Sequence, residues 1–274
     1  MRSFAAGLLV LFFASCASCA TSPCEVGPAT AAAKNAASFD ALEWAPFERP
    51  ETGWEVYEPL IAREIGTVCP AASPGFAAAL AAWQKAHGTQ ATGILDRATF
   101  ARMKQVLQER RPFVAQSRKA CPPAPQQSEL VQAAPDESYG GKQIFLRPQA
   151  LGAYRLMVAA ARAERHALAS DPKLFTIFSG YRSPAYDAAR CTREGNCQGV
   201  VRATCSAHRT GFAMDLYLGA APGFAPDSSA DVNRLYLSRS IGYRWLVRNA
   251  SRFGFVNYPF EPWHWEWTGP PPRK

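Results

Sequence analysis

The sequence is short of charge and of histidine, and it lacks a second long apolar run. Charged residues make up 19% of its 274 residues and hydrophobic residues 48%, which is the balance of a folded, soluble protein with a sizeable core. Only four histidines are present, so few imidazole ligands are available to a transition metal. After the first twenty residues no stretch is apolar enough for a membrane span. This length predicts one large domain or two small ones.

The N-terminus is the apolar exception. Arg2 precedes an apolar run over 4–14, and small residues and cysteines follow it. This pattern predicts a secretory signal peptide over 1–20, and hence an exported protein that is periplasmic or associated with the cell envelope. Because no later run can anchor the chain, any attachment would be a lipid on Cys16 or Cys19, which would make the protein a lipoprotein.

Export makes the eight cysteines interpretable, because thiols pair in an oxidising compartment. Cleavage after Ala20, or a lipid on Cys19, leaves an even set of six, whereas a lipid on Cys16 leaves seven. The even set favours structural disulfides among the remaining cysteines, although the sequence does not give their pairing. They are Cys24, Cys69, Cys121, Cys191, Cys197 and Cys205.

The net charge of +8 favours a polyanionic partner. For an exported protein, an anionic cell-wall polymer fits this charge better than nucleic acid does. Proline and polar clusters then divide the chain. We expect an Ala-rich, mobile linker over 21–53, a helical domain over 54–112, a Pro-rich linker over 113–138 and a larger domain over 139–274.

The helical domain carries a recognisable pattern. Phe76, Leu80 and Trp83 recur at helical spacing, and Asp96 stands where it can cap a second helix. The stretch resembles a peptidoglycan-binding domain, which would hold the protein on the cell-wall polymer. The alternative is a three-helix spacer. The matching residues are Trp83, Gln84, Gly88, Thr92, Gly93, Asp96 and Thr99.

The larger domain mixes helices and strands. A helix is predicted over 146–169, with Pro148 suited to its first turn, and the run LFTIFSGYRS predicts a strand from which Arg182 emerges. In GFAMDLYL the apolar residues alternate, which points Asp215 away from the apolar face of a strand. A helix over 238–250 and a strand-like FGFVNY follow, so an α+β fold is predicted.

Three residues of this domain form a candidate metal-ligand set. A catalytic zinc site needs three His, Asp or Glu ligands and one open position, and His208, Asp215 and His264 supply such a set. Cys205-x-x-His208 also has the spacing of a structural zinc site, although an oxidising compartment favours disulfides.

Three blocks in order give a resemblance. Residues 206–215 (SAHRTGFAMD) look like S-x-H-x-x-G-x-A-x-D, residues 179–183 (SGYRS) match a further block, and residues 245–267 match the C-terminal signature. Together they resemble the zinc D-alanyl-D-alanine carboxypeptidase family typified by vancomycin-resistance carboxypeptidases, which implies a hedgehog-like α+β fold. The resemblance implies zinc ligands His208, Asp215 and His264, general base Glu261, oxyanion stabiliser Arg182, and substrate contacts from Ser206, Tyr181 and Ser183.

The implied activity is zinc-dependent hydrolysis of the terminal D-alanyl-D-alanine bond of peptidoglycan stem peptides. Two alternatives stay open at this point. One is a peptidoglycan endopeptidase that cuts a cross-link or an L-alanyl-D-glutamate bond, since the same chemistry cleaves any suitably presented amide. The other is a wall-binding protein without activity. The insert CTREGNCQGVVRATC departs from the family loop and leaves the substrate open. The oligomeric state is not predicted.

EPWHWEW presents two acids for one histidine. Strand alternation places Glu266 on the same face as His264 and the three tryptophans on the other. Pro262 cannot donate to a sheet ladder, so we expect the strand to begin there and Glu261 to lie in the preceding turn, free to reach a metal. The family pattern also favours Glu261 as base and has a basic residue at position 266. Glu266 is then expected behind the ligands or at the cleft rim.

Overall fold

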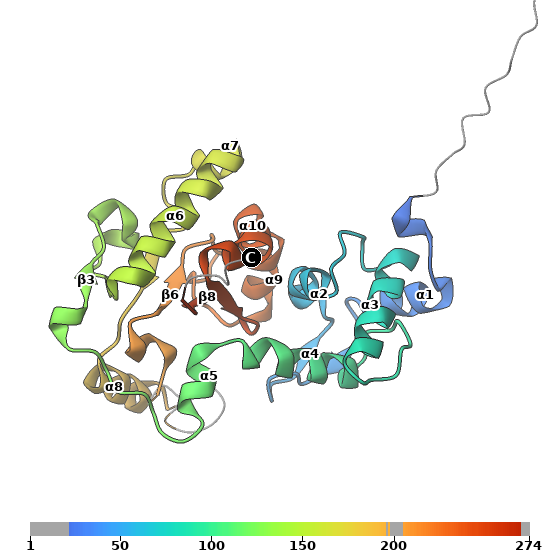
Figure 1. Ribbon diagram of the computed structural model, residues 1–274, viewed down its shortest axis with the longest axis horizontal. Helices are drawn as coiled ribbons and strands as arrows, with labels where there is room; N and C mark the ends of the chain where they lie inside the picture. The colour runs from blue at the N-terminus through green and yellow to red at the C-terminus, as the bar shows by residue number, and fades with distance from the viewer. Residues whose placement is uncertain (1–21, 196, 198–204, 270–274) are drawn as a thin grey trace, which may run out of the picture.

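The computed structural model describes residues 22–195, 197 and 205–269 (Figure 1). The predicted signal peptide, with Cys16 and Cys19, lies outside the described residues. Among those that are described, no helix has the length and apolarity of a membrane span. The chain forms an N-terminal unit, residues 22–117, beside a C-terminal unit, residues 121–269 (Figure 1).

The N-terminal unit is helical. Its elements are α1 (Ala29–Ser38), β1 (Glu43–Trp44), β2 (Glu51–Thr52), α2 (Glu58–Glu64), α3 (Pro74–Ala86), α4 (Arg97–Glu109) and α5 (Pro112–Ser117). Asp96 caps α4 by accepting a hydrogen bond from the Thr99 backbone at 2.7 Å, as the sequence predicted. The buried Gln84 accepts from the Gly93 backbone at 2.8 Å and donates to the Thr99 hydroxyl at 2.8 Å. The residues of the peptidoglycan-binding pattern therefore join α3, the following loop and α4.

The expectation of a mobile linker over 21–53 is wrong for α1. Ala31 and Ala32 are buried against Ala77 of α3, because methyl side chains let the two helices approach closely. The buried Asn35 donates to the Gly93 carbonyl at 2.9 Å and accepts from the Leu95 backbone at 2.8 Å. Helix α1 is thus part of the folded N-terminal unit.

The C-terminal unit has a central four-stranded antiparallel sheet of order β5-β6-β8-β7, and the predicted α+β class is confirmed. Its strands are β3 (Val131–Gln132), β4 (Phe145–Leu146), β5 (Ile177–Ser179), β6 (Ala213–Leu216), β7 (Phe255–Tyr258) and β8 (Glu261–Trp267). Its helices are α6 (Pro148–Glu164), α7 (His166–Ala169), α8 (Pro184–Glu194), α9 (Asp231–Arg239) and α10 (Ile241–Asn249). Strands β3 and β4 form a separate pair.

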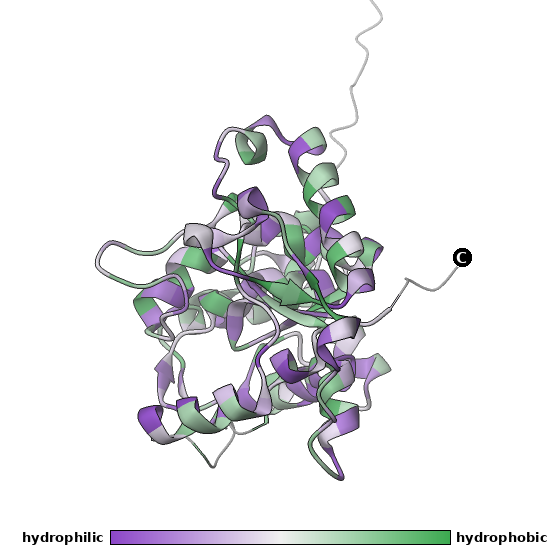
Figure 2. Ribbon diagram, turned by 90° about the vertical axis from the view of Figure 1, so that its left-hand side faces the viewer, coloured by the Kyte–Doolittle hydropathy of each residue, from purple (hydrophilic) through white to green (hydrophobic). Residues whose placement is uncertain are grey.

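The sheet separates a hydrophobic core from the candidate site. Trp263, Trp265 and Met214 pack with residues of α6 and α10 in one buried cluster, and strongly hydrophobic ribbon segments lie at the centre of the molecule in Figure 2. In the register of β6 and β8, Met214 lies opposite Trp265 and Asp215 lies opposite His264. Because neighbouring residues of a strand point to opposite faces, Asp215 and His264 share the face away from this core.

The two units share a core as well as a boundary. Tyr258, the last residue of β7, and Phe260, in the turn before β8, are buried in the aromatic cluster of the N-terminal unit. The fully buried Arg234 of α9 reaches across to Glu51, with Nη1 at 3.0 Å from Oε2, and its Nη2 donates to the Tyr57 hydroxyl at 2.6 Å. The N-terminal unit therefore packs directly onto the turn that leads into β8.

Candidate metal centre

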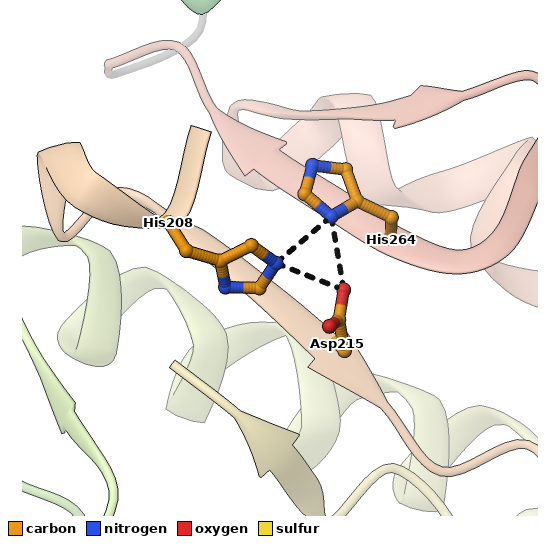
Figure 3. Close-up of side chains that lie close together, drawn as sticks. All are labelled: His208, Asp215 and His264. Atoms are coloured by element: carbon orange, nitrogen blue, oxygen red, sulfur yellow. Dashed lines mark hydrogen bonds and ion pairs between the residues drawn. The ribbon is translucent and has the colours of Figure 1, made fainter. Parts of the chain in front are cut away.

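Three buried side chains converge on one face of the sheet (Figure 3). His208 comes from the short 3-10 helix Ala207–Thr210, Asp215 from β6 and His264 from β8. Nε2 of His208 lies 3.2 Å from Nδ1 of His264 and 3.2 Å from Oδ1 of Asp215, and the last two atoms are 2.9 Å apart. The structure thus brings together the three candidate ligands that the sequence named.

Local backbone geometry explains the convergence. Gly211 ends the 3-10 helix with φ of 73°, and a Cβ there would lie 3.0 Å from the Leu130 side chain. Glycine adopts this left-handed conformation without the steric cost of a side chain. The turn then feeds directly into β6, where Asp215 is paired with His264 across the sheet.

The remaining nitrogen of each histidine has an acceptor. His208 Nδ1 lies 2.7 Å from the Gly180 carbonyl oxygen, and His264 Nε2 lies 3.3 Å from Glu266 Oε1. When these nitrogens carry the protons, His208 Nε2 and His264 Nδ1 are free to bind a metal, which is the usual arrangement of metal-binding histidines. Two imidazoles and one carboxylate with an open side fit a catalytic zinc ion.

The electrostatics of the group are unequal. Burial opposes charge on Asp215, but the two histidines keep the pKa of its carboxyl well below the ordinary value. Burial and the nearby Arg182 lower the pKa of His208 to about 4. Burial opposes the charged form of His264, yet hydrogen bonds to Asp215 and Glu266 raise its pKa to about 9. In the metal-free protein at pH 7, these pKa values make Asp215 an anion, His208 neutral and His264 a cation that is protonated on both ring nitrogens.

Glu261 lies beside the converging atoms. Its Oε2 is 3.9 Å from His264 Nδ1, and its side chain is 21% exposed. The protein surroundings raise the pKa of this carboxyl by desolvation. The expectation that Glu261 precedes the strand is wrong, since β8 begins at Glu261. The β7–β8 register shifts between Asn257 and Tyr258, and the Asn257 amide donates to the carbonyls of Glu261 and His264 at 3.1 and 2.8 Å.

Arg182 lines the same cleft. Its Nη2 donates to Asp215 Oδ2 at 3.3 Å, so the guanidinium forms an ion pair at the end of a strand. Its Nε is buried and has no hydrogen-bond partner among the described residues. The side chain is 12% exposed, so part of it borders the cleft.

Glu266 lies behind the candidate ligands, and its placement at the cleft rim is wrong. The residue is 2% exposed. Its carboxylate accepts from His264 Nε2 and from the guanidinium of Arg111, whose Nε lies 2.7 Å from Oε1. Burial opposes ionisation, but Arg111 and His264 lower the pKa of Glu266 to about 2. Sequence reasoning missed Arg111 because it lies 155 positions away in the chain and belongs to no motif.

A cleft of about 510 Å³ opens over this group. Ser206 lines it and donates to the carboxylate of Asp187 at 3.0 Å. Tyr181 and Ser183, also expected to contact substrate, are not among its described lining residues, and the Ser183 hydroxyl caps α8 by accepting from the Tyr186 backbone at 3.2 Å. The charged side chains of the lining are of both signs: Arg111, Lys142, Arg182, Arg190 and Arg193, with Glu194, Asp215, Asp227 and Glu261.

Three disulfides join the six cysteines predicted to pair. They are Cys24–Cys69, Cys121–Cys205 and Cys191–Cys197. Since Cys205 is bonded to Cys121, the structural zinc site suggested by Cys205-x-x-His208 is wrong. The Cys121–Cys205 disulfide instead ties the Pro-rich segment over 113–138, expected to be a linker, to the approach to His208.

The chain is similar to known cell-wall proteins. Residues 143–270 match the family model of D-alanyl-D-alanine carboxypeptidases, and residues 71–103 match that of putative peptidoglycan-binding domains. No curated protein sequence matches the chain. A solved structure of the LdcB LD-carboxypeptidase is 24% identical and covers 53% of this chain and 70% of its own, with a TM-score of 0.39. The VanYB structure in complex with D-Alanine-D-Alanine is 22% identical and covers 56% and 83%, with a TM-score of 0.33.

A further structure, of a vancomycin-resistance D,D-pentapeptidase VanY variant in complex with Zn(II), is 22% identical and covers 56% of this chain and 85% of its own, with a TM-score of 0.32. The two family matches show a segment similar to peptidoglycan-binding domains followed by a segment similar to peptidases. More particularly, residues 143–270 of the C-terminal unit are similar to D-alanyl-D-alanine carboxypeptidases.

Proposed function

We propose that this protein is a zinc-dependent D-alanyl-D-alanine carboxypeptidase that removes the terminal D-alanine from peptidoglycan stem peptides. The observation that carries the proposal is the convergence of His208, Asp215 and His264 in the lining of a cleft, with the Glu261 carboxylate beside them. The match of residues 143–270 to the carboxypeptidase family supports the choice of substrate.

In this proposal His208 Nε2, His264 Nδ1 and a carboxylate oxygen of Asp215 hold a zinc ion. When bound, the ion supplies a Lewis acid that makes water nucleophilic near neutral pH. Glu261 accepts the proton that is lost as water attacks, and then donates a proton to the leaving amino group. Its raised pKa suits a group that must both take and give a proton.

Arg182 and other polar side chains of the cleft would contact the substrate. The guanidinium of Arg182, which lines the cleft, can donate to the scissile carbonyl oxygen as negative charge develops there. The Ser206 hydroxyl, which lines the cleft, is placed to contact the peptide. Arg190 and Arg193 are paired with Glu194, whereas Lys142, which forms no ion pair among the described residues, favours a substrate that carries a carboxylate, as the end of a stem peptide does.

The remaining parts would bring this site to the wall. We propose that the helical domain predicted over 54–112 binds peptidoglycan, which its match over 71–103 supports. A signal peptide over 1–20 would export the protein to the periplasm or cell envelope, with lipidation on Cys16 or Cys19 as a further anchor. The α+β domain predicted over 139–274 would then act on stem peptides within reach.

Product analysis by mass spectrometry tests the activity. Purified protein should release D-alanine from a muramyl pentapeptide, stop after chelation and regain activity when zinc is added. Release of larger fragments from cross-linked or L-alanyl-D-glutamate-containing muropeptides would assign an endopeptidase instead. A zinc-loaded protein that binds peptidoglycan but hydrolyses no muropeptide would refute the enzyme and leave a wall-binding protein.

A further inference from the structure

A buried ion pair links the N-terminal unit to the candidate metal centre. Arg111, between α4 and α5, directs Nε and Nη2 to Glu266 Oε1 at 2.7 and 2.5 Å. The same oxygen lies 3.3 Å from His264 Nε2. A single carboxylate oxygen therefore contacts both a guanidinium of one unit and a candidate metal ligand of the other.

The surroundings fix both partners. The side chains of Arg111 and Glu266 are 8% and 3% exposed. The guanidinium stacks over the Tyr258 ring, 4.1 Å from its centroid, and donates to Gln108 at 2.5 Å. The Phe113 backbone lies 3.4 Å from the other oxygen of Glu266. Rotating the carboxylate would break contacts on both of its oxygens, and the buried groups have little water with which to replace them.

We propose that Arg111 and Glu266 are positioning residues for the metal centre, through which the N-terminal unit holds the ring of His264. This inference rests on the proposed metal site. With its Nε2–H bonded to Glu266, His264 keeps Nδ1 turned toward Asp215 and His208. Arg111 lies outside both matched regions, 71–103 and 143–270, so its contribution belongs to the joining of the two domains in this chain.

A measurement of zinc affinity distinguishes a positioning role of Arg111 from a role in stability alone. Loss of the hydrogen-bond partner of a metal-binding histidine typically weakens metal binding by about 10–100-fold. We expect Arg111→Met to weaken zinc binding by about that factor, measured by competition with a chromophoric chelator. The visible absorption of the cobalt(II)-substituted protein should change as the ligand geometry relaxes. Arg111→Lys, which keeps the charge, should recover part of the affinity.

A second buried ion pair provides the matched control. Glu51 pairs with Arg234 across the same boundary and bonds the Tyr57 hydroxyl, but contacts no candidate ligand. Glu51→Gln should therefore lower Tm while zinc affinity stays within about twofold of the parent. Glu266→Gln should weaken zinc binding about tenfold, and its combination with Arg111→Met should cost less than the sum of the single changes, because the two residues act on one ring.

The inference is overturned if Arg111→Met lowers Tm as Glu51→Gln does, yet leaves zinc affinity and the cobalt spectrum at parent values. If Arg111→Met does not fold, unchanged zinc affinity in both Arg111→Lys and Glu266→Gln overturns it equally. Failure of the parent protein itself to bind zinc would instead refute the proposed metal centre. The two failures are therefore distinguishable in one set of titrations.

Discussion

At the scale of single residues, Glu261 and Glu266 occupy different environments on the same strand. Glu261 is partly exposed and borders the cleft, whereas Glu266 is buried and ion-paired with Arg111. A residue that exchanges protons with a substrate needs access to it, and a residue that orients a ligand does not. The structure therefore favours Glu261 as the base.

Substitution of the two acids tests this assignment. Glu261→Gln should retain zinc but lower kcat by a factor on the order of 10²–10⁴, the typical contribution of a general base. Glu266→Gln keeps an oxygen that can accept from His264, so with saturating zinc it should keep appreciable activity. Steady-state kinetics with a pentapeptide, alongside zinc content, measure both. The reverse ranking of the two variants would contradict the assignment.

The pKa of His264 predicts how zinc binding depends on pH. In the metal-free protein this pKa is raised to about 9, so at pH 7 the ring holds an Nδ1 proton that zinc must displace. Zinc affinity should therefore rise with pH up to about 9. Above that pH the ring of His264 is already neutral, so its titration should raise the affinity no further. Isothermal titration calorimetry at pH 7 in buffers of different ionisation enthalpy should show release of about one proton. No proton release would contradict the prediction.

Sequence patterns located the candidate ligands and offered a position behind them for Glu266, but they did not indicate its partner Arg111. His208, Asp215 and His264 belong to short motifs whose spacing is visible in the chain, and the structure brings them together. The pairing of Arg111 with Glu266 depends on how two separately folded segments meet, and no local period or motif encodes that contact.

At the scale of elements, the amphipathic helices could be predicted from the sequence, whereas helix α1 and the first residue of strand β8 could not. Helices α3 and α4 follow apolar periodicity and an Asp cap. Helix α1 was not predicted because its many alanines give no clear alternation of apolar and polar residues. The helix is held in place by its packing against α3 and by the hydrogen bonds of Asn35. The start of β8 was misplaced because the Asn257 side chain bonds to the carbonyls around Pro262.

The Cys121–Cys205 disulfide should stabilise the segment between the units. It joins residues 84 positions apart, so its removal frees a long loop in the unfolded chain. Replacing both cysteines with serine should cost about 2–5 kcal/mol in the free energy of unfolding, measured by urea denaturation. The Cys191–Cys197 pair, with a separation of 6, is the control and should cost less. Equal losses would contradict the loop-length argument.

At the scale of the whole molecule, the two units are joined through buried polar contacts as well as aromatic packing. Arg234 is fully buried and bonds Glu51, Tyr57 and the Phe260 carbonyl. Neither unit alone indicates the contacts with Glu51 and Tyr57, because Arg234 lies on the other side of the predicted domain boundary. The sequence predicted two domains but not that they share a core.

Removing the Arg234 guanidinium should be costly. Arg234→Met leaves Glu51 as a buried, unpaired charge, and loss of one partner of such a pair costs about 3–5 kcal/mol. Arg239→Met is the control, since Arg239 pairs with Glu55 across the same boundary but is 57% exposed, and exposed pairs contribute about 0–1 kcal/mol. Urea denaturation of both variants measures the difference. A loss below 1 kcal/mol for Arg234→Met would contradict the prediction.

The burial of Tyr258 and Phe260 in the core of the N-terminal unit has a consequence for how the protein would work on a polymer. A hydrolase on a long flexible tether sweeps a wide area around its point of attachment. Here the unit that would bind the wall and the unit whose cleft would hydrolyse stem peptides pack against each other through a shared core. Hydrolysis should therefore occur at a fixed distance along the polymer from the position where the N-terminal unit binds, and the spacing of trimmed stem peptides would reflect that distance.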